Sequence, residues 1–229
     1  FLINSSHHKN TGVHMSIRDE RKQQSRQALL DAALTLSTSG RSFSSISLRE
    51  VAREVGLVPT AFYRHFQDMD ELGKELVDQV ALYLKSVVHQ LGHGLAQPNA
   101  KAQTSMEHFF HAVDVYPQQW IFMIAERWGG SEVVRHSIAR EIEFLNDDLA
   151  NDLTKFEIVQ NFDDVADLRG LTNILINLSF TWAMSWISLC RQYKGIELEL
   201  QKMVLKKQAV TQVHLIFKGI SNWEGRKEV

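Results

Sequence analysis

The fold is decided by residues 43–72, which read FSSISLREVAREVGLVPTAFYRHFQDMDEL. Within them, Ser47 and Glu50 form a capping-box pattern. The serine hydroxyl accepts the third amide of a new helix, and the glutamate reaches back to the serine amide. Gly56 suits the left-handed position that ends such a helix, and Pro59 suits the first turn of the next one, where no amide donor is needed. The segment therefore predicts two short helices joined by a tight turn.

The second of these helices is expected to span residues 59–66 and to expose hydrogen-bond donors and rings. Two short helices joined in this way are typical of the helix-turn-helix motif, whose second helix enters the major groove of DNA. Two connecting helices of an ordinary α-helical bundle would have the same spacing. Spacing alone leaves both interpretations open, because generic helix-turn-helix signals are weak.

The residues in this segment closely resemble the N-terminal domain of TetR-type transcriptional repressors over roughly residues 18–75. The resemblance rests on the apolar positions Leu48, Val51 and Ala52, on Gly56, on the run Phe62-Tyr63-x-His65-Phe66 and on Leu72. The chain is also similar to the FabR/DesT subgroup, both here and in ERWGGSEVVRHSIAREIEFL at Glu126–Leu145. Members of that subgroup repress unsaturated fatty-acid synthesis and respond to long-chain acyl thioesters. The resemblance implies a ligand-responsive repressor that binds a palindromic operator, with no catalysis and no cofactor.

The composition is that of an ordinary globular protein, with 229 residues, 44% hydrophobic residues and a net charge of −2. A single cysteine, Cys190, excludes an internal disulfide framework and a cysteine-rich zinc site, and it fits a cytoplasmic location. Residues 1–14, which include His7-His8 and lack helical periodicity, are interpreted as a cloning remnant.

The charge is distributed unevenly along the chain. Residues 15–66 carry eight basic and five acidic side chains, a net charge of +3. From residue 67 onward there are 16 basic and 22 acidic side chains, a net charge of −6. A basic N-terminal part on an acidic body favours an anionic partner for that part.

Helical periodicity along the whole chain predicts an all-α fold of about nine helices. We expect a helix-turn-helix domain at residues 15–67 and a larger effector-binding and dimerisation domain at residues 68–229. The first long helix is expected at about residues 18–38.

Two C-terminal helices, at about residues 171–190 and 197–223, are predicted to form a homodimer interface. The first is uncharged but contains several Asn, Ser and Thr residues, which argue for a buried helix of a soluble protein rather than a membrane span. It is apolar on two sides, as helices between two packed layers usually are. The second helix has an apolar edge formed by Val210, Val213, Phe217 and Ile220. Both helices would also fit the core of a monomer.

Candidate DNA contacts follow from side-chain chemistry and the resemblance together. Thr60 is expected to read a base edge, and Tyr63 is expected to contact a phosphate. The full set is Ser45, Ser47, Arg49, Pro59, Thr60, Tyr63, Arg64 and His65, with Arg18 and Lys22 on the first helix. For the charged positions of the first helix, an ordinary solvated face is the alternative.

An aromatic-rich middle section is the candidate effector site, although such residues also commonly form a core. The predicted ligand-binding residues are Phe109, Phe110, Val113, Trp120, Met123, Arg127, Trp128 and Phe180. Their apolar side chains would enclose a long acyl chain. Glu126 and Arg127 are expected at the edge of the cavity, with Arg127 near the opening that leaves the charged carrier in water.

Two other functions are weighed against this prediction. A multidrug-sensing repressor of an efflux pump would place several acidic residues in the effector cavity. A helical-bundle metalloenzyme would need a metal site, for which Glu107, His108, His111 and Asp114 are the candidates on one helix. No second ligand cluster accompanies them in the sequence, so we predict no metal site.

Overall fold

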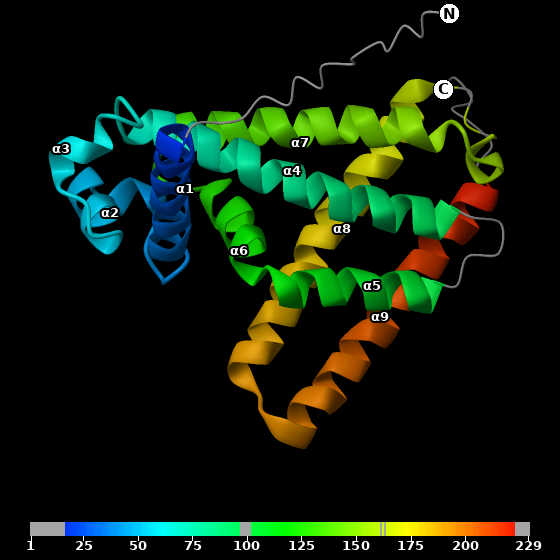
Figure 1. Ribbon diagram of the computed structural model, residues 1–229. Helices are drawn as coiled ribbons and strands as arrows, with labels where there is room; N and C mark the ends of the chain where they lie inside the picture. The colour runs from blue at the N-terminus through cyan, green and yellow to red at the C-terminus, as the bar shows by residue number, and fades with distance from the viewer. Residues whose placement is uncertain (1–16, 97–101, 161, 163, 223–229) are drawn as a thin grey trace, which may run out of the picture.

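The computed structural model describes residues 17–96, 102–160, 162 and 164–222, and in these residues it contains nine α-helices and no strand (Figure 1). The all-α prediction is confirmed for this part of the chain. Residues 1–14, interpreted as a cloning remnant, lie outside the described residues. The α-helices are α1 (Ile17–Ser37), α2 (Leu48–Glu54), α3 (Pro59–Phe62), α4 (Met69–Ala96), α5 (Ala102–Val115), α6 (Pro117–Glu126), α7 (Glu132–Leu153), α8 (Val165–Gln192) and α9 (Gly195–Ser221). Two short 3-10 helices lie at Phe43–Ser45 and Glu157–Val159.

Helices α1 to α3 form a small N-terminal domain at one end of the molecule (Figure 1). Its core contains Phe62 and Phe66, which are fully buried with ring centroids 5.6 Å apart. The Arg26 guanidinium on α1 lies 4.0 Å from the centroid of the Phe66 ring and donates a 2.8 Å hydrogen bond to Glu75 on α4. These contacts fix the small domain to the first turns of α4.

Helices α4 and α7 run side by side along the larger domain (Figure 1). Two glycines on α4 allow this close packing. A Cβ at Gly73 would lie 2.8 Å from Val134 near the start of α7, and a Cβ at Gly92 would lie 2.9 Å from Leu149 near its end. Because neither glycine has a side chain, the two helices contact each other at both ends.

Helix α8 crosses the larger domain and has the length and composition of a membrane span. Its inner face is instead occupied by protein contacts, with Trp182 and Trp186 almost fully buried. The buried Thr172 hydroxyl donates to the side-chain oxygen of Asn146 on α7, at 2.5 Å. These contacts support the interpretation of α8 as a core helix.

Helix α3, predicted to span residues 59–66, is shorter than expected. The regular α-helix ends at Phe62 and not at Phe66. Three-residue turns follow, in which the Arg64 amide donates to Ala61 at 3.2 Å and the His65 amide donates to Phe62 at 2.8 Å. The tighter winding carries the chain toward the core, where the Phe66 ring is buried.

The C-terminal helices also differ from the prediction. Helix α8 begins at Val165 rather than Leu171, because the Asp164 carboxylate caps it by accepting the Ala166 amide at 2.8 Å. On α9, Val213 and Ile220 are 1% and 5% exposed within the monomer. Their expected place in a dimer interface is therefore wrong, since the protomer's own core already covers them.

Candidate functional site

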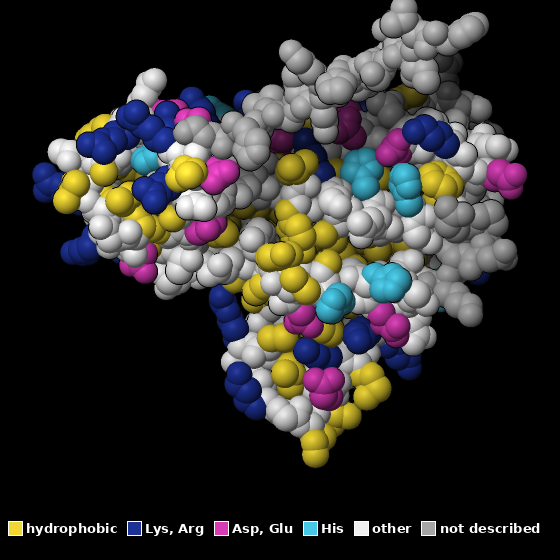
Figure 2. Space-filling view, viewed as in Figure 1, with side chains coloured by type: hydrophobic (Ala, Val, Ile, Leu, Met, Phe, Trp, Pro, Cys, Tyr) yellow, Lys and Arg dark blue, Asp and Glu magenta, His cyan; other side chains and the backbone are white. Residues whose placement is uncertain are grey.

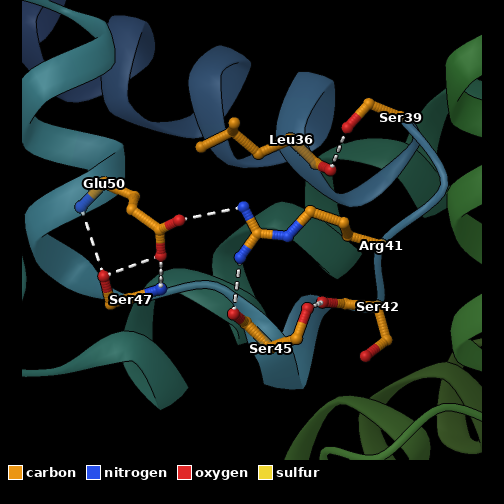
Figure 3. A network of polar contacts seen from close by, with 7 residues as sticks. All are labelled: Leu36, Ser39, Arg41, Ser42, Ser45, Ser47 and Glu50. Carbon is orange, nitrogen blue, oxygen red and sulfur yellow. Dashed lines mark hydrogen bonds and ion pairs between the residues drawn. The ribbon is translucent and has the colours of Figure 1, made fainter.

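The start of α2 contains the predicted capping box (Figure 3). The Ser47 hydroxyl accepts the Glu50 amide at 3.3 Å, and the Glu50 carboxylate accepts the Ser47 amide at 2.9 Å. Arg41 donates to the other Glu50 carboxylate oxygen at 2.9 Å and to the Ser45 carbonyl at 2.7 Å. The Arg41 hydrogen bond and the Ser47 donors lower the pKa of Glu50 to about 2. Glu50 is therefore an anion at neutral pH, and it ties the loop before α2 to the helix.

The turn between α2 and α3 also forms as predicted. Gly56 has a φ of +70°, in the left-handed region that favours glycine. Pro59 occupies the first turn of α3, and Val58 precedes it without a side-chain cap. The fixed φ of proline and the packing of Phe62 therefore start this helix.

Nine of the ten predicted DNA contacts are exposed on the small domain. They are Arg18, Lys22, Ser45, Ser47, Arg49, Pro59, Thr60, Tyr63 and Arg64. Lys and Arg side chains gather at this end of the molecule (Figure 2). This exposed set has the polar and basic character that phosphate and base contacts require. It includes Thr60 on α3 and Tyr63, which directly follows α3.

His65 differs from the other predicted contacts because it is half-buried. Its Nδ1 is buried and, in the described part of the chain, has no hydrogen-bond partner. Burial lowers the pKa of the imidazole, and the nearby cations Arg26, Lys22 and Arg64 lower it further. A neutral ring follows at pH 7, so His65 would contribute a hydrogen bond rather than a charge.

Four of the eight predicted effector residues come together inside the larger domain. Phe109 lies 5.4 Å from Phe110 and 5.5 Å from Trp120, measured between ring centroids, and Trp120 lies 6.2 Å from Phe180. The Phe110 ring stacks on Trp186 at 4.4 Å. All five side chains are buried, so in this conformation the rings fill the space between α5, α6 and α8.

The residues after α6 do not enclose that space as predicted. Trp128 is 82% exposed, because α6 ends at Glu126 and Trp128 lies in the turn that follows. Arg127 donates to the Asn177 amide oxygen on α8 at 3.1 Å. Glu126 is only 1% exposed and accepts the Phe43 amide at 2.8 Å. The prediction that Glu126 lies at the edge of the effector cavity is therefore wrong, because its carboxylate contacts the small domain instead.

A cavity of about 420 Å³ lies beside the aromatic cluster. Thr35, Thr38 and Ser39 at the end of α1 form one wall, and residues of α5, α6 and α8 form the others, namely Val113, Asp114, Pro117, Gln118, Ile121, Trp186, Ile187, Cys190 and Arg191. Val113 is the only predicted effector residue in this lining. Sequence reasoning missed the cavity because its walls come from segments far apart in the chain.

The predicted metal candidates Glu107, His108, His111 and Asp114 do not assemble into a group of three ligands in the described residues. Asp114 instead accepts the Trp186 indole N–H at 2.7 Å. This hydrogen bond places its carboxylate at the cavity wall and orients the indole.

Comparison with known proteins gives a family match for the small domain and a fold match for most of the chain. Residues 29–76 match the family described as bacterial regulatory proteins, tetR family. The fold is similar to a TetR-family transcriptional regulator from Rhodococcus sp., with a TM-score of 0.59, 14% identity and 87% and 100% of the two chains covered. It is also similar to the fatty acid degradation regulator FadR from Bacillus halodurans, with a TM-score of 0.55, 10% identity and coverage of 85% and 93%. The repressor NalD of the MexAB-OprM multidrug efflux pump in Pseudomonas aeruginosa gives a TM-score of 0.56, 19% identity and coverage of 89% and 100%.

Proposed function

We propose that this chain, a tetR-family regulator by its DNA-binding domain, is a homodimeric cytoplasmic repressor that responds to long-chain acyl thioesters. Regulators of this family are DNA-binding transcription factors and not enzymes. Its all-helical fold, with a small helix-turn-helix domain and a larger helical domain, is the fold of the TetR-family neighbours. On this basis we infer that the chain is a ligand-responsive regulator of transcription, and the identity of the ligand is part of the same proposal.

The observation that carries the effector proposal is the cavity beside the aromatic cluster, whose apolar lining includes Val113, Ile121 and Trp186. Phe109, Phe110, Trp120 and Phe180 are buried with other rings, and the adjoining cavity of about 420 Å³ falls within the range of roughly 300–1,000 Å³ typical of ligand pockets. Each methylene buried there would contribute about 0.8 kcal/mol. The FadR neighbour, described as a regulator of fatty acid degradation, agrees with an acyl ligand.

The position of the cavity suggests how a ligand could affect DNA binding. Thr38 directly follows α1 of the small domain, whereas Ile121 and Trp186 belong to the larger domain, and all three line the same space. A ligand that fits one relative position of these walls better than another shifts the balance between the two positions. A ligand with equal affinity for both positions would have no effect on operator binding.

Exposed apolar side chains on α8 and α9 support the homodimer. Ile174 on α8 is 52% exposed, and on α9 Leu200, Val204 and Leu215 are 47%, 51% and 65% exposed. The groove between the two helices is lined by Val204 together with Met184 and other residues. Exposed apolar side chains on neighbouring helices suit a protein interface, and a twofold dimer would place two recognition helices on a palindromic operator.

A multidrug sensor is the second candidate function. The NalD neighbour represses an efflux pump, and Asp114 places one carboxylate at the cavity wall, where a cationic compound could pair with it. Arg191 lines the same cavity and would instead pair with the phosphates of an acyl-thioester carrier. The two proposals therefore differ in the charge of the ligand that they predict.

The test is operator binding in the presence of each ligand class. Duplexes selected by the full chain from a random pool would serve as operator, titrated with saturated and unsaturated acyl thioesters of sixteen and eight carbons. We expect the sixteen-carbon ligands to change DNA affinity, the eight-carbon ligands to act far more weakly, and a cis double bond to alter the response. Indifference to chain length and unsaturation, with displacement of DNA by a cationic dye, would favour the multidrug sensor.

A matched pair of variants on α6 tests the cavity itself. Ile121→Trp would fill the cavity, whereas Ile124→Trp adds the same bulk to a half-buried position of the same helix outside the cavity lining. We expect Ile121→Trp to weaken the acyl-thioester response and Ile124→Trp to retain it. Equal responses in the two variants would place the effector elsewhere.

A further inference from the structure

The C-terminal ends of α4 and α7 bring three metal-ligating side chains together. Because Gly92 has no side chain, α4 packs closely on Leu149 of α7. His89 and His93 lie four residues apart and therefore on one face of α4. In the sequence, Gly92 lies between them. Asp152 lies three residues after Leu149, on the face of α7 that meets them.

The distances between the donor atoms suit a tetrahedral metal ion. His89 Nδ1 lies 3.2 Å and His93 Nε2 lies 3.4 Å from Oδ2 of Asp152, and all three donor atoms lie within 4.8 Å of one another. Zinc bonds of about 2.0–2.1 Å at tetrahedral angles place neighbouring ligand atoms roughly 3.3 Å apart. Two of the three ligand-to-ligand distances thus already match, and small side-chain rotations would adjust the third.

The cluster is partly exposed to solvent, which can supply a water ligand. The side chains of His89, His93 and Asp152 are 24%, 46% and 30% exposed, so solvent reaches the cluster from one side. Histidine side chains are visible at the surface over the far part of α4 (Figure 2). On the inner side, the Phe156 ring packs edge-on against His93 with a centroid distance of 5.3 Å and restricts the orientation of the imidazole.

Asp152 presents one of its two carboxylate oxygens to the histidines. Lys155 donates a 2.7 Å hydrogen bond to the other oxygen, Oδ1. Lys155 occupies Oδ1, whereas the two histidines face Oδ2. The Lys155 side chain is 71% exposed, so it can move into solvent when a cation binds.

We propose that His89, His93 and Asp152 form a binding site for a divalent transition metal of the zinc class, with water as the fourth ligand. Two imidazoles and one carboxylate are a donor set that zinc commonly uses. The bound ion would join α4 to α7. Since the other end of α4 carries the small N-terminal domain, the site lies on the helix that connects the two domains.

The experiment is a zinc titration of the full chain after treatment with a chelator, followed by calorimetry. The test variant is His89→Gln/His93→Gln. The control is His108→Gln/His111→Gln, which removes two exposed histidines from α5 that belong to no three-ligand group in the described residues. All proteins retain His7 and His8, so zinc binding by the N-terminal segment is common to them. We expect the control to bind like the parent protein and the test variant to lose one zinc site.

Two further measurements keep the result clear of folding artefacts. Asp152→Asn preserves shape, and we expect it to weaken zinc binding about tenfold or more, since even loss of an outer-shell partner typically costs 10–100-fold. Zinc should raise the thermal unfolding midpoint of the parent and control proteins, in proportion to the logarithm of its concentration, and not that of the test variant. Equal zinc affinity in the parent protein, His89→Gln/His93→Gln and Asp152→Asn would overturn the proposal. An isolated hydrogen-bonded His–Asp–His cluster would give no zinc binding that depends on these residues.

Discussion

The Glu126 carboxylate at the end of α6 accepts a 2.8 Å hydrogen bond from the backbone amide of Phe43, in the 3-10 helix that precedes α2. The Phe43 ring also packs edge-on against Phe122 of α6, with ring centroids 6.4 Å apart. Oε2 of Glu126 is buried without a hydrogen-bond partner in the described structure. A buried carboxyl group thus joins α6 of the larger domain to the segment that leads into α2 and α3 of the small domain.

Removal of this hydrogen bond should destabilise the protein. In Glu126→Ala the Phe43 amide would remain buried without an acceptor, at a cost of about 1–3 kcal/mol. Glu126→Gln retains a carbonyl oxygen at the same place and should preserve most of the stability. The free energy of unfolding in urea measures both changes. Equal stability of Glu126→Ala and the parent protein would contradict a structural role for the bond.

The same carboxylate predicts a pH dependence. Burial raises the pKa of Glu126 above its ordinary value of 4.5, and the Phe43 hydrogen bond opposes the shift in part. A raised folded-state pKa gives a contribution to stability that is full below pH 4.5 and is lost as the pH rises through the folded-state value. Relative to Glu126→Gln, the parent protein should therefore lose stability from pH 4.5 toward neutral pH. Parallel stability profiles for the two proteins would refute the shift.

The turn before α3 should depend on its glycine. Gly56 has a φ of +70°, and a Cβ at this position would meet no atom within 4 Å, so Gly56→Ala introduces backbone strain without a steric clash. We expect a loss of about 1–2 kcal/mol in the free energy of unfolding. Gly170→Ala is the matched control, because Gly170 is equally open but lies within α8, where alanine should add roughly 0.5–1 kcal/mol. Changes of the same sign would contradict this explanation.

Thr60 should contribute to sequence discrimination. It is exposed on the first turn of α3, where recognition helices contact base edges. Thr60→Ala should reduce discrimination at one base pair by about 1–3 kcal/mol, measured by competition between the selected operator and its single-base variants. Thr211→Ala, on the exposed part of α9, is the control and should leave discrimination intact. A uniform loss of affinity for all duplexes would assign Thr60 to phosphate contact instead.

The proposed dimer interface predicts an effect of charge on association. Val204→Glu would bury an unpaired carboxylate between protomers and should raise the dissociation constant by tenfold or more, or about 1.4 kcal/mol. Leu82 on α4 is even more exposed, at 73%, so Leu82→Glu controls for the loss of a surface apolar group. Sedimentation over a range of protein concentrations distinguishes the two. Dimers of unchanged stability in Val204→Glu would place the interface elsewhere.

The two short helices and their turn could be predicted from nearby residues alone. Ser47 with Glu50, Gly56 and Pro59 each act on backbone groups close by along the chain. Because the interacting groups are close along the chain, the residues that form them can be recognised in the sequence. The end of α3 was less predictable, because the burial of Phe66 in the domain core decides where the regular helix stops.

Which residues meet across the fold depends on how the helices pack. Trp120 and Trp128 are both predicted to line the cavity from the aromatic-rich sequence around them. Trp120 is fully buried and Trp128 is exposed, because α6 ends between them. Likewise, the spacing of His89 and His93 was present in the sequence, but their carboxylate partner comes from α7. Periodicity predicts the face of a helix, whereas the neighbour of that face depends on how the helices pack. The cavity between α1, α5, α6 and α8 and the contact between Glu126 and Phe43 arise from that packing.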